Sequence, residues 1–145
     1  MVRAFVRRME RDDLRLRFGS PRDFRDEVIL RQSFDIEAGG GEMAWVLDDA
    51  AAIAGMSHRI KVSRSQAEIA LIVRSDLKRL GIGEFLLWQM VTRARRQGLG
   101  ALTGLVLWEN RAMRRLAAKV GAVPRQVGAS TMELTLEIDL AAAVA

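Results

Sequence analysis

AEIALIVRSDLKRLGIG, the stretch from Ala67 to Gly83, carries the clearest structural signal in the chain. It begins with a branched, apolar run, Ile69 to Val73, that is typical of a buried strand. The polar residues Arg74 to Asp76 cannot continue that burial, so the chain must reach the surface there. Gly81 and Gly83 then remove side chains where the backbone turns into an apolar helix. Because such a helix N-terminus presents free N–H groups and a positive dipole, the stretch predicts a phosphate-bearing ligand.

The composition is that of one soluble domain, with 145 residues of which 50% are apolar and 28% charged. No apolar run reaches the roughly 18 residues of a membrane helix, and no cleavable apolar segment follows the basic N-terminus. The chain contains no cysteine, so we expect a cytoplasmic protein without disulfides or a thiolate nucleophile. Because His58 is the only histidine, a zinc site or a Ser-His-Asp triad has little to build with, and we expect no metal.

The net charge is +5, from 23 basic and 18 acidic residues. Nucleic acid is one partner for such a balance, but no nucleic-acid motif accompanies it and aromatic residues are few. We therefore expect no nucleic-acid partner and a solvated surface for most arginines. Five basic residues are exceptions because they lie in or beside the predicted phosphate site: Lys78, Arg79, Arg111, Arg114 and Arg115.

The order of the predicted elements is strands, then strand–helix–strand–helix, then strands, which is the order of a mixed α/β sheet. The segment Leu14–Phe18 fits either a strand or a short helix. Ser20 as cap and Pro21 at the first position predict a helix that runs to about Ser33. The other predicted helices are Gly83–Gln97 and Asn110–Gly121, and the predicted strands are Val2–Arg8, Glu42–Leu47, Ala52–Val62, Ala67–Arg74, Leu102–Trp108, Val123–Gly128 and Thr131–Ile138.

Two common phosphate-binding loops do not fit the glycines. The GxxxxGK[ST] pattern of a P-loop is absent, and the run from Gly81 to Leu86 lacks the last glycine of a dinucleotide fingerprint. A third family fits: the strand Glu68–Val73, the loop Lys78–Gly83 and the helix Asn110–Gly121 together resemble the GNAT N-acetyltransferases. In that family the loop reads Arg/Gln-x-x-Gly-x-Gly/Ala and holds the pyrophosphate of acetyl-CoA on backbone amides. Here Lys78 stands at the first position.

This resemblance implies a central mixed, mostly antiparallel sheet flanked by helices. It implies a single acetyltransferase domain over residues 1–145. Residues 1–41 would form an acceptor-side N-terminal part, 42–121 the acetyl-CoA-binding core, and 122–145 the C-terminal strands and tail. It also implies a GNAT-type acyltransferase that consumes acetyl-CoA and releases CoA.

Three sequence segments are similar to those of bacterial Pat-type protein lysine acetyltransferases: AEIALIVRSDLKRLGIG, VLWENRAM and VGA. Those enzymes modify a lysine in adenylating enzymes such as acyl-CoA synthetases. A protein lysine is therefore the first acceptor implied, and a small amine such as a polyamine or aminoglycoside is the second. A catalytically silent CoA-binding regulatory domain and a basic nucleic-acid-binding module are the competing hypotheses. The sequence does not decide between a monomer and a homo-oligomer.

Glu68 is the predicted general base. It alternates with Ala70 and Ile72 on one strand face, a pattern that by itself fits a solvated glutamate equally well. The Pat-type resemblance is what implies the catalytic role. His58 on the neighbouring strand is the competing base, although a lone histidine in a strand is more often structural. With no cysteine for an acetyl-enzyme, direct attack of the amine in a ternary complex is the economical mechanism.

The resemblance also implies the cosubstrate contacts. The N–H groups of Ile72 and Val73 would bind the pantetheine arm and polarise the thioester, and Asn110 would both cap its helix and touch CoA. The family's frequent acid is a tyrosine at the position of Ala117, but this chain has no tyrosine, so the thiolate must leave unassisted or be protonated by water or the ammonium product. The predicted cosubstrate-binding residues are Leu71, Ile72, Val73, Lys78, Arg79, Leu80, Gly81, Ile82, Gly83, Glu84, Asn110 and Met113, and acidic groups for the cationic amine are Asp12, Asp13, Asp23, Asp26 and Asp48.

Overall fold

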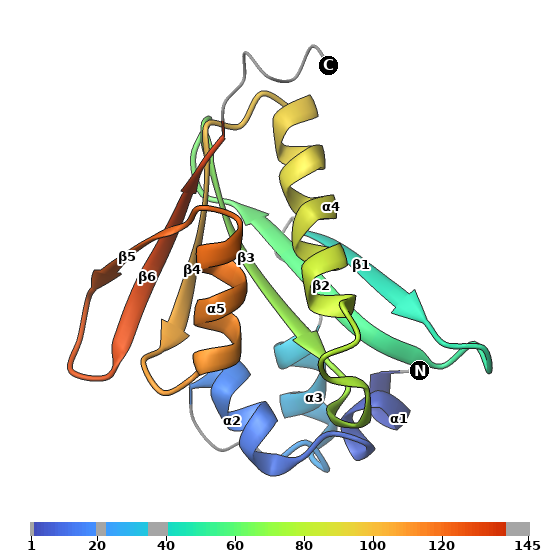
Figure 1. The fold of residues 1–145 in the computed structure, drawn as a ribbon. Coiled ribbons are helices and arrows are strands. Elements are labelled where there is room, and N and C mark those ends of the chain that lie inside the picture. Colours follow the sequence, from blue (N-terminus) through green and yellow to red (C-terminus); the bar gives the residue numbers. More distant parts are fainter. Residues whose placement is uncertain (1, 20–22, 35–40, 139–145) are drawn as a thin grey trace.

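The computed structural model describes residues 2–19, 23–34 and 41–138. The described chain begins with three short helices. The strands of one sheet follow, with two longer helices between them along the chain (Figure 1). In chain order they are α1 (Val2–Arg7), α2 (Arg11–Phe18), α3 (Glu27–Phe34), β1 (Glu42–Leu47), β2 (Ile53–Lys61), β3 (Gln66–Val73), the 3₁₀ turn η2 (Ser75–Leu77), α4 (Ile82–Arg96), β4 (Ala101–Leu107), α5 (Arg111–Lys119), β5 (Val123–Gln126) and β6 (Thr131–Glu137).

The sheet has six strands in the order β1-β2-β3-β4-β6-β5. Its neighbours pair antiparallel except for β3 and β4, which are parallel. This parallel pair is short, since Gln66–Glu68 of β3 meet Ala101–Thr103 of β4 and the pairing then ends. Beyond Glu68 and Thr103 the two strands diverge, so that the middle of the sheet opens as a fork (Figure 1).

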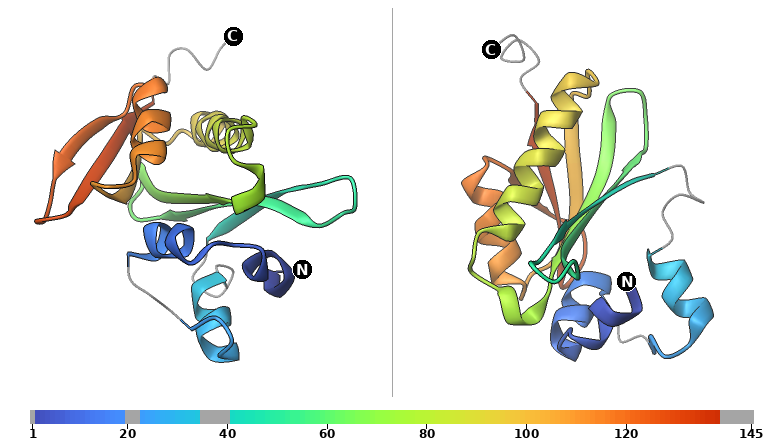
Figure 2. Two further views of the ribbon diagram at one scale, coloured as in Figure 1. Left: turned by 60° about the horizontal axis from the view of Figure 1, so that its bottom comes forward. Right: turned by 90° about the vertical axis from the view of Figure 1, so that its right-hand side faces the viewer.

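Helices cover both faces of the sheet, α4 and α5 on one side and α1 to α3 on the other (Figure 2). Side chains of β3 alternate between the two layers as a buried strand requires. Ala67 joins the core beneath α4 with Leu87 and Leu102. Ile72 joins a second core with Phe5 of the N-terminal helices. The third core, beneath α5, contains Val106, Ala117, Met132 and Leu134.

The prediction for the N-terminus was wrong in one segment and undecided in another. Val2–Arg8 does not form a strand, because α1 is a helix that buries Phe5 and Val6 against the sheet. The adjacent, ambiguous segment Leu14–Phe18 belongs to helix α2. The predicted helix start at Ser20 and Pro21 lies outside the described residues. Helix α3 begins at Glu27, where the carboxylate of Asp26 accepts hydrogen bonds from the first turn at 2.8 and 3.3 Å.

The remaining elements agree with the predictions to within a few residues. Strands β1, β2, β3, β4, β5 and β6 and helices α4 and α5 all lie where the sequence pattern indicated. Within the described ranges, no helix is long and apolar enough to cross a membrane. Over those same ranges, no three histidine or acidic side chains group closely enough to hold a metal ion.

Candidate functional site

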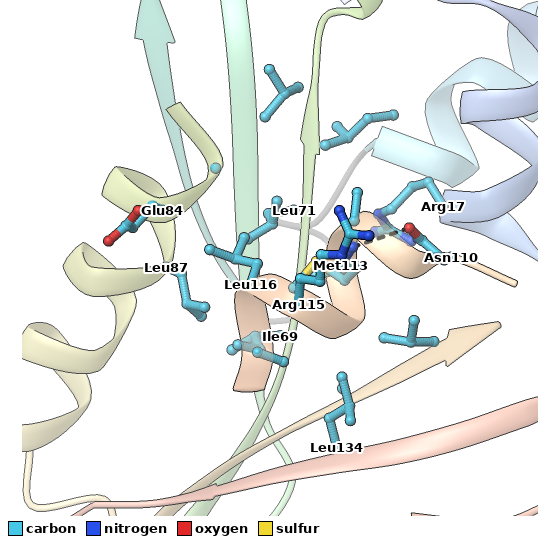
Figure 3. A pocket seen from close by; sticks show the side chains of 18 of the residues that line it. Arg17, Ile69, Leu71, Glu84, Leu87, Asn110, Met113, Arg115, Leu116 and Leu134 are labelled. Carbon is cyan, nitrogen blue, oxygen red and sulfur yellow. Dashed lines mark hydrogen bonds between the residues drawn. The ribbon is translucent and has the colours of Figure 1, made fainter. Parts of the chain in front are cut away.

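The fork between β3 and β4 holds a cavity of about 860 Å³ (Figure 3). Its walls come from the two diverging strands, the β3–α4 loop, the first turn of α4, one face of α5 and part of α2. Most of the lining is apolar, with Leu71, Met113 and Leu116 on the walls. The cavity is therefore a mainly apolar space that the more polar β3–α4 loop borders on one side.

Two hydrogen bonds fix which backbone groups of β3 face this cavity. The Arg74 N–H donates to the Ala54 carbonyl at 2.8 Å, and the Val62 N–H donates to the Gln66 carbonyl at 3.0 Å. The β2–β3 register between these two bonds is continuous. In an antiparallel ladder every second residue bonds the neighbouring strand, and the residues between them direct their N–H and C=O groups the other way. The even-numbered residues of β3 thus bond β2, and the odd-numbered residues face β4.

The backbone groups that enter the fork are therefore those of Leu71 and Val73. No described residue of β4 pairs with β3 beyond Glu68, so no strand takes up these groups. The expectation for Val73 agrees with this geometry, but that for Ile72 does not, because the Ile72 N–H points to Met56 on β2. Leu71 takes the place that the sequence assigned to Ile72. Two outward N–H groups on one strand edge can bind an extended ligand with amide groups of its own.

The β3–α4 loop ends in a helix N-terminus with free N–H groups. Gly81 is the N-cap, with φ of 84°, and no side chain caps α4. The first helical N–H with a backbone partner is that of Phe85, which donates to the Gly81 carbonyl at 3.0 Å. Within the described chain, the N–H groups of Ile82, Gly83 and Glu84 make no such bond. These groups and the positive end of the helix dipole are suited to bind an anion beside the cavity.

Eleven of the twelve residues predicted to bind the cosubstrate line this one cavity, and Leu80 is the exception. The Leu80 side chain is 67% exposed and is not part of the lining. Lys78, at the first position of the loop motif, hydrogen-bonds to the Asp13 carboxylate of α2. Arg79 follows with φ of 64°, a left-handed conformation that non-glycine residues seldom adopt. The loop brings the predicted residues together, and their binding role remains a prediction.

Helix α5 forms the opposite wall. The Asn110 side chain accepts a hydrogen bond from the Met113 N–H at 3.2 Å, so its predicted role as the helix cap is confirmed. Arg111 and Arg115 line the cavity. Arg114 does not, because its guanidinium stacks over the Trp108 ring at 4.0 Å and donates to the Trp108 carbonyl at 2.9 Å. Arg114 therefore does not lie in the cavity, and a contact of Arg114 with the phosphates stays a prediction.

Arg74 fixes the loop to the body of the sheet. Its side chain is only 3% exposed, and it donates to Asp76 at 2.7 Å, to Asp48 at 3.0 Å and to the Ile53 carbonyl at 3.0 Å. The hydrogen bond from Arg74 lowers the pKa of Asp76. The hydrogen bond from the Ala52 N–H is the main cause that lowers the pKa of Asp48, and the hydrogen bond from Arg74 is the second. Both carboxylates are thus ionised partners of one buried cation where β3 ends and the loop begins.

Glu68 lies at the apex of the fork, as the last residue of β3 that pairs with β4. Its side chain is exposed, and the alternation along β3 places it on the face of Ile72, the face of α1 to α3. It is not among the residues that line the cavity. The carboxylate therefore lies on the opposite side of the sheet from α4 and α5, where it is accessible from solvent.

His58, the competing base, pairs with Ala70 in the β2–β3 register and is half-buried. Burial, with the nearby charge of Arg17, lowers the pKa of His58 to about 4. The ring is neutral at pH 7. The Arg17 guanidinium donates a hydrogen bond to Nε2 of the ring at 3.1 Å. His58 thus serves as an acceptor that holds Arg17, which itself lines the cavity. This is a structural use of the imidazole.

Helix α2 contributes lining residues that the sequence did not reveal, namely Asp13, Leu16 and Arg17. Asp13 is one of the acidic groups expected to attract the cationic amine. It contacts the β3–α4 loop, where the Ser75 hydroxyl donates to it at 2.6 Å. More than 60 residues separate these partners along the chain. No local pattern carries that information, because the contact depends on where the N-terminal helices pack.

Comparison with known proteins agrees with this geometry. The model of the acetyltransferase (GNAT) family matches residues 5–122. The chain belongs to the GNAT acetyltransferase family. The resemblance drawn from the loop and the α5 cap is thereby confirmed, as are the mixed, mostly antiparallel sheet and the class of enzyme.

Solved structures share the GNAT fold at low sequence identity. The GNAT domain of S. lividans PAT matches with a TM-score of 0.80 and 14% identity, over 92% of this chain and 81% of that one. A phosphinothricin acetyltransferase from Sinorhizobium meliloti, in complex with AcCoA, matches with a TM-score of 0.67 and 18% identity, over 95% and 85%. The Salmonella typhimurium protein yncA, with its cofactor acetyl-CoA, matches with a TM-score of 0.64 and 19% identity, over 78% and 73%. At such identities the likeness concerns the fold alone.

Proposed function

We propose that this GNAT protein transfers the acetyl group of acetyl-CoA to an amine, with a protein lysine side chain as the first acceptor. The observation that carries the proposal is the fork itself. One strand edge with free N–H groups leads directly to a helix N-terminus with three more. Two of the solved GNAT structures with this fold contain acetyl-CoA, which supports the same cosubstrate here.

Each part of acetyl-CoA has a counterpart in the cavity. The diphosphate would accept hydrogen bonds from the N–H groups of Ile82, Gly83 and Glu84. The pantetheine arm carries amides, and it would lie in the fork as a short additional strand bonded to Val73, which leaves the Leu71 N–H for the thioester carbonyl. The apolar walls exclude water from the arm. This placement would bring the thioester toward the apex of the fork, where Glu68 is the last residue of β3 that pairs with β4.

The reaction requires a base because a free lysine amine has a pKa of about 10.4. Glu68 would take the proton, directly or through a water molecule, while the amine nitrogen attacks the thioester carbonyl. The Leu71 N–H would stabilise the oxyanion. The C–S bond then breaks, and sulfur leaves as the thiolate of CoA. Ala117 is buried in an apolar core and offers no acid, so water or the ammonium product supplies the thiolate proton.

The acceptor is the least constrained part of the proposal. Glu68 is exposed on the face opposite α4 and α5, which suits a long side chain presented by another protein. The fold match to the S. lividans PAT domain over most of both chains also favours the Pat-type acceptor. Phosphinothricin acetyltransferase, however, shares the fold at a comparable coverage. A small amine therefore remains the second acceptor, and a CoA-binding regulatory domain without turnover is the non-catalytic alternative.

The test combines cosubstrate binding with turnover. Acetyl-CoA should raise the thermal midpoint in a concentration-dependent manner, since it binds only the native state. Glu68→Gln should keep the dissociation constant for acetyl-CoA and lower the rate of thiol release about 100-fold or more at pH 7. Glu137→Gln, an exposed carboxylate at the end of β6, is the matched control and should behave as the wild type.

The choice of acceptor needs a second measurement. An acyl-CoA synthetase and a polyamine, offered separately with acetyl-CoA, should distinguish the two acceptor classes by the mass of the acetylated product. Binding of acetyl-CoA without thiol release for either amine would favour the regulatory domain. Loss of both binding and turnover in Glu68→Gln would mean that Glu68 is structural.

A further inference from the structure

Asp13 occupies an unusual position for a carboxylate, because it lines the cavity in which the proposed function places a diphosphate. Its side chain is 10% exposed. One carboxylate oxygen accepts the Ser75 hydroxyl at 2.6 Å, and the other contacts the Lys78 ammonium. Helix α2 thereby holds the first cation of the phosphate loop.

Two anions, the Asp13 carboxylate and the diphosphate, would then compete for one cation, Lys78. A diphosphate would bind to the N–H groups of Ile82 to Glu84. Lys78, whose side chain carries an ammonium group, lies a few residues earlier in the same loop and lines the same cavity. In the structure the Lys78 ammonium forms an ion pair with the Asp13 carboxylate. The carboxylate would also face the phosphates as a like charge, and in a partly buried cleft such repulsion is less screened than at the open surface.

We propose that Asp13 sets the affinity for the acyl donor by competing with the diphosphate for Lys78. The inference rests on the proposed function, since it needs the diphosphate in this cavity. When the diphosphate binds, Lys78 changes partner from the carboxylate to the phosphate. Asp13 keeps its bond from the Ser75 hydroxyl, which also accepts the Glu10 N–H at 2.8 Å, so α2 stays anchored to the loop. Asp13 is in these terms a positioning residue that acts through Lys78.

The neighbouring residue on α2 provides a matched control. Asp12 carries the same charge, but its side chain is exposed and bonds to Arg15 of its own helix at 2.7 Å. Arg15 also bonds to Glu109, at 2.6 Å, on the loop between β4 and α5. Asp12, Arg15 and Glu109 do not line the cavity. Removal of the Asp12 charge changes the electrostatics of α2 without changing the partner of Lys78.

Isothermal titration of the protein with CoA at low ionic strength tests the competition. Asp13→Asn should lower the dissociation constant about five-fold, the upper range for an exposed ion pair, and the gain should shrink in high salt. Asp12→Asn should leave the constant unchanged, and Asp13→Glu should restore the wild-type value. In a Lys78→Gln background, Asp13→Asn should gain less than half as much, because the cation in dispute is absent.

A gain in affinity is the decisive readout, because damage to the fold would only weaken binding. Unchanged or weaker CoA binding in Asp13→Asn would overturn the competition and mean that Asp13 aligns Lys78 for the ligand instead. An equal gain in the Lys78→Gln background would overturn the route through Lys78. Failure of the wild type to bind CoA at all would instead contradict the proposed function.

Discussion

Gly81 and Gly83 make opposite demands on the backbone, although both belong to the same loop motif. Gly81 has φ of 84°, a conformation that side chains with a β-carbon rarely adopt. Gly83 lies inside α4 with an ordinary helical conformation, and a β-carbon there would meet the Leu116 side chain at 3.3 Å. That neighbour is the end of a flexible side chain, which can move by a few tenths of an ångström. We therefore expect Gly81→Ala to be damaging and Gly83→Ala to be tolerated.

The magnitudes follow from backbone energetics. Alanine in the left-handed region costs about 1–2 kcal/mol, so Gly81→Ala should lower the free energy of unfolding by that amount. At about 2–4 °C per kcal/mol for a domain of this size, the thermal midpoint should fall by about 2–8 °C. In a helix, alanine is more favourable than glycine by up to about 1 kcal/mol, so Gly83→Ala should raise the midpoint by about 1–4 °C.

Calorimetry of both variants, with and without CoA, checks the argument. Gly81→Ala should also weaken CoA binding, because relief of its strain moves the Gly81–Ile82 peptide and with it the free N–H groups. Gly83→Ala should bind CoA as the wild type does, since its N–H keeps its direction. A Gly81→Ala protein as stable and as tightly binding as the wild type would refute the assigned backbone strain and the anion site built on it.

Two further predictions concern the supports of the site. Arg74→Met removes the buried guanidinium that bonds Asp48 and Asp76, but Arg8 still pairs with Asp76 at 2.8 Å, so unfolding in urea should show a loss of about 1–2 kcal/mol. His58 has its pKa lowered from 6.5 to about 4 in the fold, so protonation favours the unfolded chain. Wild-type stability should fall by on the order of 2 kcal/mol as the pH drops from 6.5 to 4. In His58→Gln that part of the pH dependence should be absent, and an unchanged pH profile would contradict the depressed pKa.

Local patterns were sufficient where a residue's role depends on its immediate neighbours. Glycine at 81 is required by the local left-handed backbone conformation, and Gly83 lies in the first turn of helix α4. Asn110 caps the residues directly after it, and the alternation in β3 follows from burial on both faces. These features identified the family, because they are the parts of the phosphate site that one short stretch of chain can build.

Local patterns failed where the partner is distant in sequence. The segment Val2–Arg8 has a spacing that suits a strand as well as a helix, and only its packing against β2 and β3 selects the helix. The sequence likewise cannot show whether Leu71 or Ile72 faces the fork, since that depends on which residues of β3 bond to β2.

By itself, then, the sequence determined the glycine turn before α4, the Asn110 cap of α5 and the class of enzyme, because backbone conformation and periodicity are set within a few residues. Tertiary structure alone decided that Asp13 holds Lys78 and that Glu68 lies outside the cavity lining. These outcomes depend on strand register and on where α2 packs, and both result from contacts between segments that lie far apart along the chain.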